Sequence, residues 1–290
     1  MNLRAYPTAG EFLAVAEVPL LREEVKNSLI LGISEQVSQG RQYGEDPPYF
    51  FSVHDRDSLI AAAIRTPPYN LILYCEQDRL EALDLVAAHL MNAGENLPGA
   101  HGTVHVVSAF SEVWARRTGV KAHVEMAQRV YCLTEVTPPL DVSGAMRWAE
   151  EGDVGTLAKW FAAFCEEAVP SDPPDDAEKN VRRFISTGSL GVWQTNGIVS
   201  MAGSSRGSKN GATVSAVYTP PEHRGNGYAS ACVAALSQVL LDRGNAFCTL
   251  YADLANPTSN KIYQRVGYRP VDDFAMYRFT AAGSGADGRW

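Results

Sequence analysis

The stretch Val214-Ser215-Ala216-Val217-Tyr218-Thr219-Pro220-Pro221-Glu222-His223-Arg224-Gly225-Asn226-Gly227-Tyr228-Ala229 is the most informative part of this chain. It predicts a β-strand that ends at two prolines, then an Arg-Gly-x-Gly loop and a helix, because proline cannot donate to a sheet ladder. The two glycines allow positive φ and a close backbone approach, so N–H groups stay free at the helix N-terminus. A loop of this kind is a seat for a phosphate or pyrophosphate, and Arg224 adds a planar cation beside it.

The sequence after the loop predicts an amphipathic helix. Its apolar residues recur at helical spacing, and they are Ala229, Cys232, Val233, Leu236, Val239 and Leu240. Arg243 and Gly244 are typical of a helix end, with a cation in the last turn and glycine just after it. The strand, loop and helix together therefore predict a site for a phosphorylated cofactor.

Three interpretations of the loop compete. Short glycine-rich matches are common in simple turns, but the flanking strand and helix argue against a mere turn. Gly225-x-Gly227-x-x-Ser230 is close to the dinucleotide-binding fingerprint, with Asp253 at the end of the next predicted strand as a ribose ligand. Against it, the double proline interrupts the tight strand-to-helix turn, and Ser230 stands where the third glycine belongs. A P-loop is excluded, because the sequence contains no G-x-x-x-x-G-K-[ST].

The third interpretation is a resemblance. Arg224-x-x-Gly227-x-Ala229 is similar to the [QR]-x-x-G-x-[GA] signature of the GNAT superfamily of N-acetyltransferases. The segment from Asn256 to Pro270, NPTSNKIYQRVGYRP, resembles the second motif of that superfamily. There a short helix ends in a glycine–aromatic turn, and a tyrosine points at the acetyl donor. Two motifs in one stretch are far more specific than either alone.

The second motif also reads as a helix from its residues alone. Asn256 is a good N-cap, Pro257 suits the first helical position, and Gly267 suits the residue after the last turn. Without the resemblance, Tyr263 is interpreted as a core aromatic whose hydroxyl finds a hydrogen-bond partner. The resemblance favours a catalytic role for Tyr263 instead.

The resemblance implies the fold and the site residues. The fold class is α/β (α+β): a GNAT fold with a mixed central sheet flanked by helices, in which two central strands splay apart to admit the pantetheine arm of acetyl-CoA. Tyr263 would protonate the departing CoA thiolate. Contacts with acetyl-CoA are implied for Val217, Tyr218, Thr219, Arg224, Gly225, Asn226, Gly227, Tyr228, Ala229, Ser230, Asn256 and Asn260. For Asn256, helix capping is an equally good interpretation.

No general base can be assigned from the sequence. Glu222 precedes the loop, and Glu166 and Glu167 end a predicted helix that in this superfamily borders the acceptor site. Each is also typical of a solvated surface carboxylate, and a chain of water molecules could serve instead.

Composition excludes several classes of protein. With 25 basic and 33 acidic residues the net charge is −8, which argues against a nucleic-acid surface and is compatible with a cationic amine substrate. No apolar run is long enough to predict a membrane span, and no secretory signal is seen, so a cytoplasmic protein is expected. The five cysteines show no metal or redox spacing, so no metal is expected.

The chain of 290 residues is expected to hold two domains. Residues 136–144, VTPPLDVSG, read as a linker. Beyond it we expect a strand near 146–149, helices over 152–168 and 175–187, and a hairpin of 190–195 and 198–203 turned at Asn196-Gly197. Further strands are expected over 212–219, 246–253 and 274–279, with a loosely held tail over 281–290.

The N-terminal half repeats features of the C-terminal half at an offset of 148 to 150 residues. Arg117-Thr118-Gly119-Val120 echoes Arg265-Val266-Gly267-Tyr268, and Met126-Ala127-Gln128-Arg129-Val130-Tyr131 echoes Met276-Tyr277-Arg278-Phe279. A hairpin over 49–53 and 59–64 and a strand over 70–75 extend the correspondence. Residues 1–137 therefore resemble a degenerate GNAT-like domain in tandem with a GNAT acetyltransferase domain over 145–280. After Cys75 comes Glu76-Gln77-Asp78-Arg79, which is a poor pyrophosphate cradle, so this half is expected to bind no acetyl-CoA.

Two functions remain open from the sequence. The first is an acetyl-CoA-dependent N-acetyltransferase for a small amine or amino-acid-like acceptor, with CoA as product and no nucleic-acid or membrane partner. The alternative is a non-catalytic acyl-CoA-binding protein with a sensory or partner-binding role. Retention of both Arg224-x-x-Gly227 and Tyr263 favours the enzyme, because a sensor needs no proton donor. A homodimer is compatible with either function.

Overall fold

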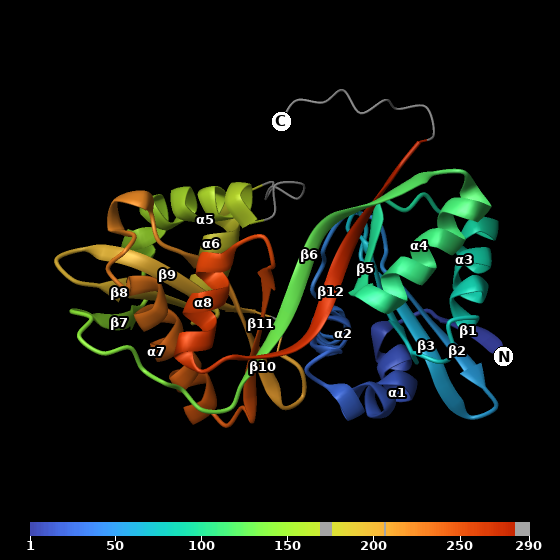
Figure 1. Ribbon diagram of the computed structural model, residues 1–290, viewed down its shortest axis with the longest axis horizontal. Coiled ribbons are helices and arrows are strands. Elements are labelled where there is room, and N and C mark those ends of the chain that lie inside the picture. The colour runs from blue at the N-terminus through green and yellow to red at the C-terminus, as the bar shows by residue number, and fades with distance from the viewer. Residues whose placement is uncertain (169–175, 206, 282–290) are drawn as a thin grey trace. The chain divides into compact units, whose positions relative to one another are not determined.

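The computed structural model describes residues 1–168, 176–205 and 207–281. The chain forms two compact units (Figure 1): Met1–Arg129 together with the segment from Asp272 onward, and Val130–Val271. The tail expected over 281–290 lies, apart from Ala281, outside the described residues.

The first unit builds a mixed sheet with helices packed against it. Its elements are β1 (Asn2–Tyr6), α1 (Ala9–Leu20), α2 (Ser28–Ser38), β2 (Tyr49–Asp55), β3 (Ser58–Arg65), β4 (Leu71–Cys75), α3 (Ala82–Asn92), β5 (Gly99–Thr103), α4 (Val104–Thr118) and the first part of β6 (Lys121–Leu133). The strand order begins β1-β2-β3-β4-β5, with β4 and β5 parallel and the earlier pairs antiparallel.

The second unit repeats this plan. It contains β7 (Ala145–Trp148), α5 (Val154–Ala168), α6 (Ala177–Ser186), β8 (Leu190–Gln194), β9 (Ile198–Ser205), β10 (Gly211–Tyr218), α7 (Tyr228–Asp242), β11 (Phe247–Asp253), α8 (Pro257–Val266) and the start of β12 (Arg269–Thr280). Its strand order is β11-β10-β9-β8-β7, with β10 and β11 parallel. The expected hairpin is confirmed, because β8 pairs antiparallel with β9 through a turn closed by the Thr195 N–H and the Gly197 carbonyl, 2.9 Å apart.

The last strand of each repeat does not stay with the unit that its chain order suggests. From Asp272 onward, β12 belongs to the first unit, where it pairs antiparallel with β5. Strand β6 enters the second unit at Val130 and is the neighbour of β11 there. The sequence placed residues 145–280 together, whereas Phe279 lies in the core of the first unit and Tyr131 in that of the second. Figure 1 shows β12 in red beside β6 in green.

The equivalent helices α4 and α8 end alike. Each stops at a glycine in the left-handed region, Gly119 with φ 76° and Gly267 with φ 112°. A strand follows each helix, β6 after α4 and β12 after α8. The repeated sequence thus corresponds to a repeated helix end and strand.

A candidate acetyl-CoA site in the second unit

Strand β10 carries a bulge near its C-terminal end. Ser215 pairs with Gly203 and Tyr218 with Met201, so two residues, Ala216 and Val217, stand opposite a single residue of β9. Ala216 has a φ of 50°, a conformation that costs an alanine about 1–2 kcal/mol. Such bulges re-aim the following side chains and end regular pairing. No feature of the sequence predicted this bulge, because the residue is not glycine.

Strands β10 and β11 already part before the bulge. Their parallel pairing runs from Gly211 with Phe247 to Thr213 with Thr249 and then stops, although β10 continues to Tyr218 and β11 to Asp253. The splay between central strands that the resemblance implies is therefore present. On the other side of β10, buried Ser200 of β9 holds the end of the strand. Its hydroxyl donates to the Tyr218 carbonyl at 3.1 Å and lies 2.8 Å from Thr219 Oγ1.

The glycine loop leaves helix α7 open at its N-terminus. Gly225 and Gly227 have φ values of 84° and 80°, and Gly227 is the N-cap without a side-chain cap. The first α7 hydrogen bond joins the Ala231 N–H to the Gly227 carbonyl at 3.0 Å, so the preceding first-turn amides have no acceptor within the helix. These amides and the helix dipole suit an anion.

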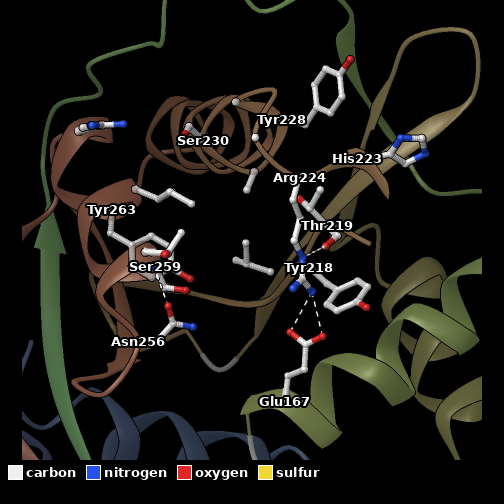
Figure 2. A pocket seen from close by; sticks show the side chains of 17 residues that line it. Glu167, Tyr218, Thr219, His223, Arg224, Tyr228, Ser230, Asn256, Ser259 and Tyr263 are labelled. Carbon is white, nitrogen blue, oxygen red and sulfur yellow. Dashed lines mark hydrogen bonds and ion pairs between the residues drawn. The ribbon is translucent and has the colours of Figure 1, made fainter. Parts of the chain in front are cut away.

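A cavity of about 480 Å³ lies between the loop, the end of β10 and helix α8 (Figure 2). Most of the predicted site residues line it, namely Val217, Tyr218, Thr219, Arg224, Gly225, Gly227, Tyr228, Ala229, Ser230, Asn256 and Tyr263. Asn226 and Asn260 are not among the lining residues. The amide of Asn226 instead donates to the carbonyls of His223 and Arg224, at 3.1 and 3.2 Å, and so shapes the loop.

Asn256 and Asn260 organise the start of helix α8. Asn256 Oδ1 accepts from the Ser259 N–H at 3.0 Å, which is the capping role that its residue type predicts. The amide of Asn260 donates to the carbonyls of Asp253 and Asn256, both at 2.7 Å, and its oxygen accepts from the Tyr131 hydroxyl, also at 2.7 Å. The hydrogen bonds of Asn260 are therefore used within the protein.

Tyr263 reaches the cavity from helix α8, on the side opposite Tyr218 and Thr219 (Figure 2). Its side chain is 9% exposed, and burial raises its pKa to about 12. The rings of Tyr268 and Tyr131 lie 6.1 and 6.4 Å from its own, which fixes the plane of the phenol. A phenol held neutral beside a cavity can donate a proton.

Arg224 joins the end of β10 to helix α5 on one side of the cavity. Its Nη2 lies 2.8 and 2.9 Å from the two carboxylate oxygens of Glu167, and its Nε donates to the Thr219 carbonyl at 2.9 Å (Figure 2). The hydrogen bond with Glu167 raises the pKa of Arg224. Glu166 and Glu222, the other carboxylates considered from the sequence, do not line the cavity.

Several lining residues were not predicted. They are His223, Thr258, Ser259, Ile262 and Arg265. Ser259 lies one helical turn before Tyr263, so helical spacing from the tyrosine could have indicated it. Tyr131 was missed because it comes from β6, which belongs by chain order to the first repeat.

The first unit differs at the equivalent positions. Helix α3 begins after Glu81, a residue in the right-handed region, without a glycine loop. At the offset of 148 residues, Ala115 stands where Tyr263 would be. The first unit thus lacks both the loop and the phenol.

Comparisons with known proteins confirm the fold that the resemblance to the GNAT superfamily implies. Residues 189–278 match the family described as FR47-like protein. The search of curated proteins found no relative.

Solved structures of similar fold cover nearly the whole chain. A Drosophila protein has a TM-score of 0.66 at 12% identity and covers 97% of this chain and 99% of its own. A GCN5-related N-acetyltransferase from Sphaerobacter thermophilus has a TM-score of 0.59 at 15% identity, covering 95% of each chain. A tandem GNAT protein from the clavulanic acid biosynthesis pathway has a TM-score of 0.57 at 12% identity, covering 98% of this chain and 100% of its own. At these identities the likeness establishes the fold.

The described ranges 1–168, 176–205 and 207–281 contain neither a metal-binding cluster nor a helix suited to a membrane. No group of three or more His, Cys, Asp and Glu side chains is arranged to hold a metal ion. None of the helices in these ranges combines the length and the apolar character that crossing a membrane requires.

Proposed function

We propose that the second unit binds acetyl-CoA and transfers the acetyl group to the nitrogen of a small amine or amino-acid-like acceptor. The observation that carries this proposal is a single cavity bounded by an open helix N-terminus on one side and the buried phenol of Tyr263 on the other. The first feature suits a pyrophosphate and the second suits a thiolate leaving group.

The lining residues fit acetyl-CoA. The first-turn amides of α7 would hold the pyrophosphate, with the glycines giving the backbone its close approach. The splayed end of β10, at Val217 and Thr219, would lie along the pantetheine arm. Acetyl-CoA supplies a thioester whose carbonyl accepts the nucleophile.

The reaction requires that the amine nitrogen be neutral when it attacks. A nitrogen–carbon bond forms, the carbon–sulfur bond breaks, and the amine loses its proton to solvent. Tyr263 gives its phenolic proton to the CoA sulfur and regains one from solvent. The phenol is protonated at neutral pH, and its pKa of about 12 keeps it so at pH 10 as well.

A non-catalytic acyl-CoA-binding role would need only the loop. The buried phenol of Tyr263 in the same cavity favours an enzyme. The first unit, without the loop and with Ala115 in place of the phenol, is proposed to bind no acetyl-CoA.

The experiment is an amine screen with detection of released CoA thiol. Acetyl-CoA should bind, and thiol release should appear with at least one amine and vanish without it. Acetyl-CoA binding with no release from a broad panel of amines would favour the sensor. NAD binding without CoA binding would end the proposal.

A further inference from the structure

The ion pair between Glu167 and Arg224 places a carboxylate in a cavity that is proposed to hold an anion. Among the described residues, Glu167 is the only carboxylate that lines the cavity, and the other lining ionisable groups besides tyrosines are His223, Arg224 and Arg265. A cavity for the anionic acetyl-CoA gains nothing from a carboxylate, which repels phosphate groups. Glu167 therefore has another use.

The ion pair is weak, so Arg224 can leave Glu167 for another anion. Both side chains are about half exposed, 47% for Arg224 and 52% for Glu167, so solvent screens their attraction and the pair stabilises the fold little. Arg224 is also the first residue of the glycine loop signature, one position before Gly225. Its planar fork binds phosphate as well as it binds carboxylate.

We propose that acetyl-CoA draws the Arg224 guanidinium from Glu167 to a phosphate, and that the freed Glu167 carboxylate then binds a cationic group of the acceptor. This inference rests on the proposed function. It makes Arg224 neutralise Glu167 while the cavity is empty and makes Glu167 a recognition residue for a positively charged acceptor afterwards. The acceptor is therefore a molecule with two nitrogen groups. One is the neutral amine that is acetylated, and the other is an ammonium group that Glu167 binds.

The position of Glu167 agrees with this role. It lies on α5 and faces Tyr218 and Thr219 at the end of β10, away from Asn256 and Tyr263 on α8 (Figure 2). An ammonium group held there would lie at the side of the cavity opposite the proton donor.

The test compares Glu167→Gln with Glu166→Gln, a matched change in the neighbouring, exposed carboxylate that does not line the cavity. Calorimetry with acetyl-CoA should give Glu167→Gln about threefold tighter binding than wild type, since Arg224 no longer has to leave a charged carboxylate. Glu166→Gln should match wild type. Equal or weaker binding by Glu167→Gln, with wild type binding normally, would overturn the exchange.

A second titration tests the acceptor side on the CoA-loaded protein. Wild type should bind 1,4-diaminobutane in preference to the neutral 1,4-butanediol, and Glu167→Gln should lose roughly tenfold in affinity for the diamine. Equal diamine binding by the two proteins, or no preference for the diamine in wild type, would refute recognition by Glu167. If no variant binds acetyl-CoA at all, the proposed function itself fails, which is a distinct result.

Discussion

At the scale of single residues, the site combines a buried phenol with an exposed ion pair. Tyr263 is buried and neutral, whereas Arg224 is charged and paired with Glu167. The sequence indicated Tyr263 and Arg224 through the two motifs. It could not show that the side-chain oxygen of Asn260 accepts from the Tyr131 hydroxyl, because Tyr131 is distant in the chain.

Removing the Tyr263 hydroxyl should slow acetyl transfer without weakening cofactor binding. Tyr263→Phe should lower kcat by roughly 10²-fold or more, because the leaving thiolate loses its proton donor. Steady-state kinetics and calorimetry with acetyl-CoA measure the two quantities. Tyr131→Phe, which removes a hydroxyl bonded to Asn260 rather than exposed to the cavity, is the matched control. Unchanged turnover in Tyr263→Phe would remove it from the mechanism.

The pH dependence of turnover follows from the same burial. The pKa of Tyr263 is raised from 10.0 to about 12, so its proton is retained, and donation continues, as the pH rises through 10. We expect kcat to rise with pH as the amine deprotonates and to show no fall near pH 10 caused by Tyr263. A fall centred near pH 10 that disappears in Tyr263→Phe would contradict this assignment.

At the scale of elements, the site lies where the pairing of β10 with β11 stops and where helix α7 begins without a side-chain cap. The sequence predicted β10, the loop and α7, because proline, glycine and helical periodicity are local signals. It did not predict the bulge at Ala216 or strand β5, whose sequence Gly-Ala-His-Gly-Thr has little strand propensity. Gly99 of β5 is required by packing, since an added Cβ would collide with the Tyr277 carbonyl of β12.

The loop should be sensitive to charge at one end of α7 and not at the other. Gly227→Asp places a carboxylate against the proposed pyrophosphate seat and should abolish acetyl-CoA binding. Gly244→Asp is the matched control, because Gly244 follows the other end of α7 and also has a positive φ, 96°. Both variants should lose about 1–2 kcal/mol of stability from the left-handed backbone. Retained acetyl-CoA affinity in Gly227→Asp, measured by calorimetry, would mean that the loop does not hold the cofactor.

At the scale of the whole molecule, the final strand of each repeat passes from one unit into the other, β6 at Val130 and β12 at Asp272. Phe279, at the end of the chain, lies in the core of the first unit beside Trp114, with ring centroids 6.4 Å apart. Tyr131, at the same place in the first repeat, lies in the core of the second unit. The sequence predicted a strand over 274–279 and a similar segment at 126–131, but pairing partners distant in the chain are not a local signal, so it could not say which sheet each would join.

Truncating a core side chain of β12 should destabilise the first unit, and truncating one of β6 should destabilise the second. Phe279→Ala should cost about 3–5 kcal/mol and increase amide hydrogen exchange in β4 and β5, with acetyl-CoA affinity retained. Tyr131→Ala should increase exchange in β11 and α8 and weaken the site. Hydrogen exchange followed by mass spectrometry measures both. Protection lost in the second unit after Phe279→Ala would contradict the placement of β12 in the first unit.

We expect one unit of the tandem, and only one, to bind acetyl-CoA. Isothermal titration of the full chain with acetyl-CoA tests it directly. We predict one bound acetyl-CoA per chain, eliminated by Gly227→Asp. Two sites per chain, or a single site that survives Gly227→Asp, would contradict the account.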